Sequence, residues 1–235
     1  MNKTHMNNLQ VSIQTSCTVT ATVKTRINLA LHHLFAACRF AARLQAIEQE
    51  YSGQAFGEFW EEAFHNGLGV ATLTVAALEC YANEMYFEGS ILGNTLTPAA
   101  AQELAQLVDK ESVLRKYSMA LAVRGGKQLD FGLAPVQNVE ALIKLRNSVV
   151  HFRPEWFGEG GKHEKLSKVL QHKFLPSAFL PNEPIFPRSW ASASFATWAL
   201  QSTVAFLEYF YNEVDITCPL RQFKTQLSSL SNNAI

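Results

Sequence analysis

Three side chains near residue 150 carry groups suited to proton transfer at a phosphate: Arg146, Asn147 and His151. A histidine near neutral pH can accept or donate a proton. A guanidinium can neutralise the charge that develops on a phosphoryl group in the transition state. An amide such as that of Asn147 can orient a phosphate or an imidazole. Because RNA supplies its own nucleophile, the 2′-hydroxyl, this set could cleave RNA without a metal ion.

The segment that must position these side chains runs from Glu140 to Pro154 and predicts one amphipathic helix. Five apolar residues recur in it at helical spacing: Leu142, Ile143, Leu145, Val149 and Val150. Asn147 and His151 are four residues apart and share a face, and the flexible stem of Arg146 can bring its guanidinium round to the imidazole. Since Pro154 cannot continue the helix, we expect His151 in the last turn, where the helix dipole favours a protonated imidazole.

An earlier segment, from about Val70 to Phe87, predicts a second long helix that is apolar until its final turns. Glu79 and Asn83 are four residues apart and share one face of it. They have two interpretations: support for the Arg146–His151 site, or a buried hydrogen-bonded pair within the helical core.

The run Arg146-Asn147-Ser148-Val149-Val150-His151 resembles the signature of the HEPN family, an Arg followed by a His after four to six residues, often with a polar residue directly after the Arg. The upstream pair Glu79 and Asn83 is also similar to HEPN proteins. The resemblance covers roughly residues 26–213. It implies metal-independent RNA cleavage that leaves a 2′,3′-cyclic phosphate, at a cleft formed by two protomers, with Arg146, Asn147 and His151 catalytic and without a cofactor. It further implies a toxin–antitoxin or phage-defence setting, with an antitoxin or a nucleotidyltransferase-like protein as partner.

The bare Arg–His spacing occurs a second time, where Arg26 precedes His32 and His33. The neighbours Ile27 and Leu29 are typical of ordinary packing, and no polar residue directly follows Arg26. We therefore expect the active site at residues 146–151.

Two alternatives to a ribonuclease remain open at the level of sequence. One is a non-catalytic HEPN-like module that binds nucleotides or assembles with a protein. The other is an unrelated helical protein, in which Arg146 pairs with a helix carboxylate and His151 only caps the last turn.

Bulk composition limits the classes of function. Hydrophobic residues make up 48% of the 235 residues and charged residues 17%, which is typical of a folded chain with a substantial core. Lys plus Arg equals Asp plus Glu at 20 each, so extended non-specific binding to nucleic acid is disfavoured, while a local basic cleft is compatible with the composition. The four cysteines lie far apart without metal-ligand spacing, which suits a reducing cytoplasm, and we expect neither a signal peptide nor a membrane span.

The predicted architecture is all-α: an antiparallel bundle of five to six helices with an extended N-terminal arm and one long loop. We expect the arm at residues 1–24, the helical domain at 25–215 and a polar, frayed tail at 216–235. The long loop, 153–188, is rich in Gly and Pro, with one short helix near Glu164 to His172. Gly67 and Gly69 are expected to break the helix that carries Phe59 and Phe64 from the one that follows.

Overall fold

The computed structural model of this chain describes residues 27–87, 92, 95–156, 158 and 160–231. The expected N-terminal arm and Arg26 of the second Arg–His match lie outside these residues. The elements are, in order, α1 (Ala30–Glu50), α2 (Phe59–Tyr86), α3 (Pro98–Val108), α4 (Val113–Gly125), α5 (Ala134–Val150), α6 (Lys162–Leu170), the short helical turn η2 (Ile185–Ser189), α7 (Ala193–Glu213), η3 (Pro219–Phe223) and α8 (Lys224–Leu230).

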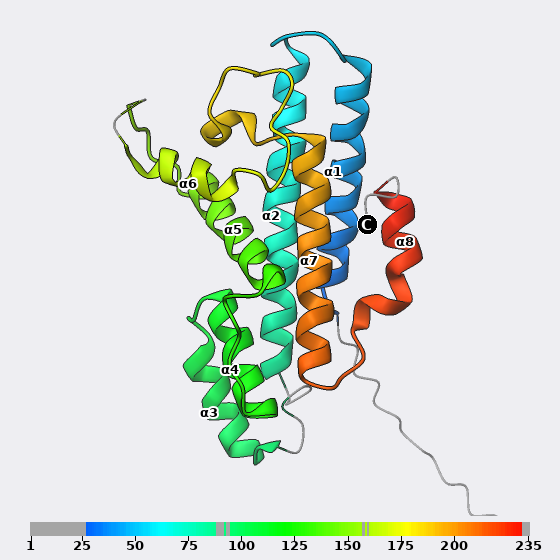
Figure 1. Cartoon of the computed structure of the whole chain (residues 1–235). Coiled ribbons are helices and arrows are strands. Elements are labelled where there is room, and N and C mark those ends of the chain that lie inside the picture. Colours follow the sequence, from blue (N-terminus) through cyan, green and yellow to red (C-terminus); the bar gives the residue numbers. More distant parts are fainter. Residues whose placement is uncertain (1–26, 88–91, 93–94, 157, 159, 232–235) are drawn as a thin grey trace, which may run out of the picture.

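The prediction of an all-α bundle is confirmed, with no strand in the described part of the chain. The long helices α1, α2 and α7 lie side by side, and α5 packs across α2 and α7 (Figure 1). α3 and α4 cover the C-terminal end of α2. The described residues form eight α-helices rather than five or six, because the short helices α6 and α8 add to the main ones.

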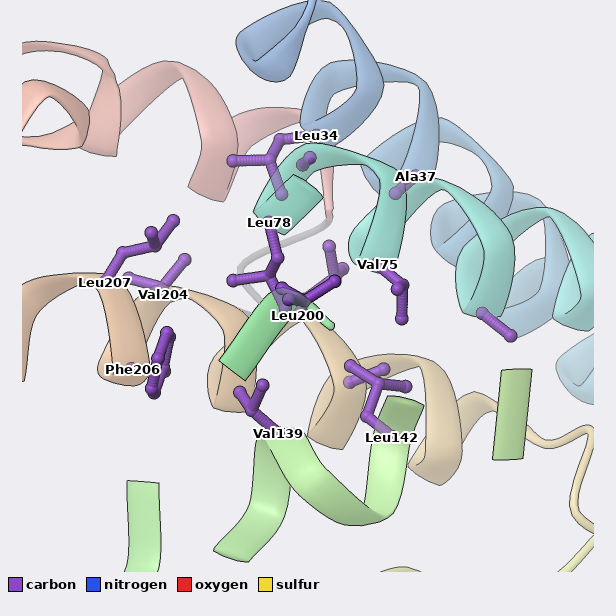
Figure 2. Packing of buried hydrophobic residues seen from close by; sticks show 14 of the residues in the cluster. Leu34, Ala37, Val75, Leu78, Val139, Leu142, Leu200, Val204, Phe206 and Leu207 are labelled. Carbon is purple, nitrogen blue, oxygen red and sulfur yellow. The ribbon is translucent and has the colours of Figure 1, made fainter. Parts of the chain in front are cut away.

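One apolar core joins the helices of the bundle (Figure 2). It includes Leu34 from α1, Leu78 from α2, Leu142 from α5 and Leu200 from α7, all fully buried. Truncating a buried leucine of this kind to alanine typically costs about 2–5 kcal/mol. The core therefore fixes α5, and with it the predicted motif, against α2 and α7.

The prediction that Gly67 and Gly69 break a helix is wrong, because α2 runs through both as one helix. A Cβ at Gly67 would lie 2.8 Å from the Cβ of Ala191, and one at Gly69 would lie 2.8 Å from the ring of Phe40. These glycines allow neighbouring segments to approach α2 closely. That gain in packing offsets their low helix propensity of about 1 kcal/mol each.

The expectation of a frayed tail after Pro219 is also wrong for the described residues 219–230. This segment forms η3 and α8, and α8 packs against α1. Leu220 and Leu227 are buried in the core, while the intervening residues are mostly exposed. The composition of this segment is polar on average, but Leu220 and Leu227 recur at helical spacing and anchor it to the core.

The segment 153–188 is a long connection, as predicted, with α6 at Lys162–Leu170 and η2 near its end. α6 packs against η2, where the hydroxyl of Ser167 accepts a hydrogen bond from the backbone N of Phe186 at 3.0 Å. α6 also contacts α5, so the connection is tied to the bundle directly beyond α5. Among the described helices, none is long and apolar enough to cross a membrane.

Candidate functional site

The helix that carries the predicted motif, α5, begins at Ala134 and Pro135, where a proline costs no hydrogen bond. Val139, Leu142 and Leu145 bury one stripe of it against the core. The helix ends at Val150, and His151 is its C-cap residue, with the backbone N of His151 donating to Asn147 O at 2.9 Å. The imidazole is thus in the last turn, as predicted, and its side chain is exposed.

A polar cavity of about 310 Å³ lies between α2, α4 and α5. Its lining includes four of the predicted site residues: Glu79, Asn83, Arg146 and Asn147. The structure therefore brings together residues from two helices that are far apart in the sequence. His151 follows one turn after Asn147 but is not among the residues that line this cavity.

Arg146 forms an ion pair with Glu79, in which Nη2 of the guanidinium donates to Oε1 of the carboxylate. The Arg146 side chain is only 18% exposed, against 42% for Glu79. The Nε atom of Arg146 is buried and has no hydrogen-bond partner among the described residues. The guanidinium is thus held toward α2, and the expected approach to the imidazole of His151 is not among the contacts in the described part of the chain.

Lys116 on α4 is a residue of this cavity that the sequence analysis missed. It is only 8% exposed. Its Nζ donates to Asn83 Oδ1 at 2.7 Å and to the carbonyl of Asp109 at 2.9 Å. Glu79 and Asn83 are therefore not a buried pair: each bonds a cation from another helix. The signal available in the sequence was a lysine at helical spacing from Val113 and Ala120, on the face of α4 that is buried.

The backbone at Lys116 is itself held by Tyr86, whose hydroxyl donates to Lys116 O at 2.5 Å. Burial raises the pKa of Tyr86 to about 12, so this hydroxyl remains a donor at neutral pH. Within the described chain, Lys116 has no carboxylate within ion-pairing distance. The carboxylates of Glu79, Asp109 and Glu111 also line the cavity, so its two cations, Arg146 and Lys116, do not leave it with an excess of positive charge.

The chain just after the motif is locally basic, although the whole protein is neutral. Between residues 151 and 173 the sequence has five Lys or Arg and three Glu, which gives +2 before its three histidines are counted. The exposed members include Arg153, Lys162 and Lys165. A local excess of positive charge in the stretch that follows His151 favours the approach of a polyanion.

A second cavity, of about 570 Å³, lies between the residues that follow His151, the start of α6 and η2. Its lining is aromatic, with the ring of Phe152 stacked on that of His163 at 5.2 Å between centroids and His163 edge-on to Phe186 at 4.8 Å. Trp156, at its rim, is 82% exposed. The sequence analysis expected only a long loop at 153–188 and did not anticipate this aromatic pocket.

Neither cavity shows a metal-ligand cluster. Among the described residues, no three His, Cys, Asp or Glu side chains gather in a way that could hold a metal ion. The polar groups of the first cavity are instead arranged as cation–acceptor pairs, namely Arg146 with Glu79 and Lys116 with Asn83.

The motif places an exposed histidine at the end of α5, while Arg146 on the same helix and Lys116 on α4 are two largely buried cations. Comparisons of the chain with protein-family models, with curated proteins and with solved structures found no match.

Proposed function

We propose that this chain is a HEPN-like, metal-independent endoribonuclease that cleaves RNA by attack of the 2′-hydroxyl. The observation that carries the proposal is the exposed imidazole of His151 at the end of α5, one turn beyond Asn147 and beside the cavity that holds Arg146. The local excess of positive charge after residue 151 supports binding of an RNA backbone there.

In this mechanism the neutral imidazole of His151 takes the proton of the 2′-hydroxyl as its oxygen bonds to phosphorus. The bond from phosphorus to the 5′-oxygen breaks, and that oxygen leaves with a proton from an imidazolium of a second protomer. Arg146 stabilises the charge on the phosphorane, and Asn147 orients the phosphate. The products are a 2′,3′-cyclic phosphate and a 5′-hydroxyl.

Glu79 then acts as a positioning residue, because its carboxylate fixes the guanidinium of Arg146. Lys116 adds a second, rigidly held positive charge to the same cavity. Both effects would pre-organise the electrostatics of the site before RNA binds, which is where enzymes gain most of their stabilisation of charged transition states.

The proposal includes a homodimer that brings two copies of α5 together. The exposed apolar side chain of Val150, in the last turn of α5, is available for such a contact and lies outside the aromatic pocket. The proposal also includes a cytoplasmic location and, as partner, an antitoxin or a nucleotidyltransferase-like protein.

A second candidate is a non-catalytic HEPN-like module that binds a nucleotide or assembles with another protein. The Arg146–Glu79 ion pair favours it, because a guanidinium already neutralised by a carboxylate has less charge to offer a phosphorane. The absence of His151 from the lining of the polar cavity favours it as well.

Incubation of the purified protein with single-stranded and structured RNA, in excess EDTA, separates the two candidates. A ribonuclease yields fragments that end in a 2′,3′-cyclic phosphate, whereas a binding module retards the RNA on a gel and leaves it intact. Light scattering at micromolar concentration should give the mass of two chains. Intact RNA under all these conditions, with a mass equal to one chain, would contradict the ribonuclease proposal.

A further inference from the structure

The aromatic pocket differs from ordinary packing because part of its aromatic surface faces solvent. Phe152 is 49% exposed and Trp156 is 82% exposed, while Phe186 behind them is buried. Large exposed rings around a concave site are costly to leave in water, and they form stacking platforms for planar ligands. A volume of about 570 Å³ is within the range of small-molecule sites.

The polar groups of the pocket limit the chemistry of what it binds. Glu155 uses Oε2 to accept from the backbone N of His163 at 3.0 Å, and Glu183 pairs with Arg188. Three carboxylates line the pocket, those of Glu155, Glu164 and Glu183, so a phosphate is disfavoured inside it. The pocket suits a neutral, planar group that can donate hydrogen bonds.

Asn182 is one polar side chain of the pocket that remains available. Its amide lines the pocket, is exposed, and has no hydrogen-bond partner in the described part of the chain. A side-chain amide has one acceptor and two donors, a set that matches the edge of an adenine bidentately. A stacking platform together with an amide is a common way to read an unpaired base.

We propose that the aromatic pocket binds one unpaired purine base of an RNA strand, stacked on Phe152 and Trp156 and read by Asn182. Phe152 directly follows His151, so a base held here places its strand beside the imidazole and the basic residues Arg153 and Lys162. The identity of the strand as a substrate rests on the proposed ribonuclease function, while the pocket itself is a binding site that does not depend on cleavage.

Titration of the intact protein with adenosine 5′-monophosphate and with uridine 5′-monophosphate tests the pocket without any cleavage step. Of the four tryptophans, Trp190 and Trp198 are buried and Trp60 is half-buried, so saturable quenching of the exposed tryptophan fluorescence reports on Trp156. We expect the adenine nucleotide to quench and to bind more tightly than the uracil nucleotide. In Trp156→Phe the quenching should vanish, while calorimetry still detects binding.

Phe152→Ala should weaken binding of the adenine nucleotide about five-fold or more, on the scale of stacking lost per base. Phe131→Ala is the matched control, because Phe131 is 51% exposed but lies outside this pocket, and it should bind like the parent. Asn182→Ala should reduce the preference for adenine over uracil.

Three results would overturn the proposal: no saturable binding of the adenine nucleotide, equal or better binding of the uracil nucleotide, or equal weakening by Phe131→Ala and Phe152→Ala. Binding with this pattern but without RNA cleavage would overturn the ribonuclease function and leave the pocket standing. RNA cleavage without nucleotide binding would overturn the pocket proposal and leave the ribonuclease function standing.

Discussion

The polar cavity and the aromatic pocket both adjoin the end of α5, yet they are built differently. The polar cavity is lined mainly by α2, α4 and α5, and its cations are held by partners on other helices. The aromatic pocket belongs to the connection between α5 and α7, with one small helix and one helical turn.

Under the proposed function, this contrast corresponds to a division of tasks. Charged groups that act in a transition state must be fixed in advance, which a helical core provides. A subsite that selects a base tolerates more variable construction, because stacking needs a face rather than an exact atom position. His151 stands between the two regions, as the last residue before the connection begins.

The largest expected effect concerns His151 itself. His151→Ala should lower the rate of RNA cleavage by about 10²–10⁴-fold, the usual contribution of acid–base catalysis, because it removes the proton-transfer group. Since the side chain is exposed, the melting temperature should remain close to that of the parent. A gel assay and a thermal melt measure both quantities.

The matched control for this change is His65→Ala, an exposed histidine on α2, which should cleave at the parental rate. Parental cleavage by His151→Ala would remove the catalytic role of the motif and would leave both cavities as binding sites only.

The next effect tests whether the polar cavity is rigid. Lys116→Met should lower the free energy of unfolding by about 1–3 kcal/mol, because the carbonyl of Asp109 and the amide of Asn83 lose a charged donor. Chemical denaturation measures this change. Lys127→Met, which alters an exposed lysine paired with Glu213, should change stability by less than about 0.5 kcal/mol.

If Lys116→Met were as stable as Lys127→Met, the cavity would not be pre-organised, and the contrast with the aromatic pocket would disappear.

A smaller effect is expected at the ion pair between Glu79 and Arg146. Glu79→Gln should cost about 1 kcal/mol, since the amide oxygen still accepts a hydrogen bond but the charge is lost next to a guanidinium that is 18% exposed. A double-mutant cycle with Arg146→Met should give a coupling energy above that of the exposed pair Arg43–Glu62, which serves as reference. Equal coupling in the two cycles would mean that Glu79 does not hold Arg146 in place.

The smallest effect is expected in the aromatic pocket, at Arg188. Its guanidinium lies 5.5 Å from the ring centroid of Trp60 and pairs with Glu183. Arg188→Lys should cost about 0.5 kcal/mol, because both interactions are partly exposed and a lysine loses the two-point contact with the carboxylate. High salt should shrink the difference in unfolding midpoint between variant and parent. A loss of several kcal/mol would show that this pocket is as tightly built as the polar cavity.

Local sequence patterns mark several of the helix ends. Thr97 and Pro98 mark the start of α3, where the Thr97 hydroxyl accepts from Ala100 N at 3.3 Å, and Gly126 closes α4 in a left-handed conformation. Pro154 correctly placed His151 at the end of α5. These features depend on residues close in sequence, so no knowledge of the fold is needed to read them.

The predictions from sequence were wrong at positions whose structure depends on long-range packing. Gly67 and Gly69 were read as helix breakers by their propensity, but they are the positions at which Ala191 and Phe40 approach α2. Likewise, Leu220 and Leu227 lie in a segment of mostly polar residues, and their burial depends on packing against the bundle.

For the candidate site, the sequence by itself determined which groups could do chemistry and that His151 would end its helix, because residue type and i, i+4 spacing are local properties. Only the tertiary structure decided the partners. The fold pairs Arg146 with Glu79, 67 residues away, and carries Lys116 from α4 to Asn83 on α2. Charge pairing across helices depends on how the core sets their relative positions, and that information is not contained in any single segment.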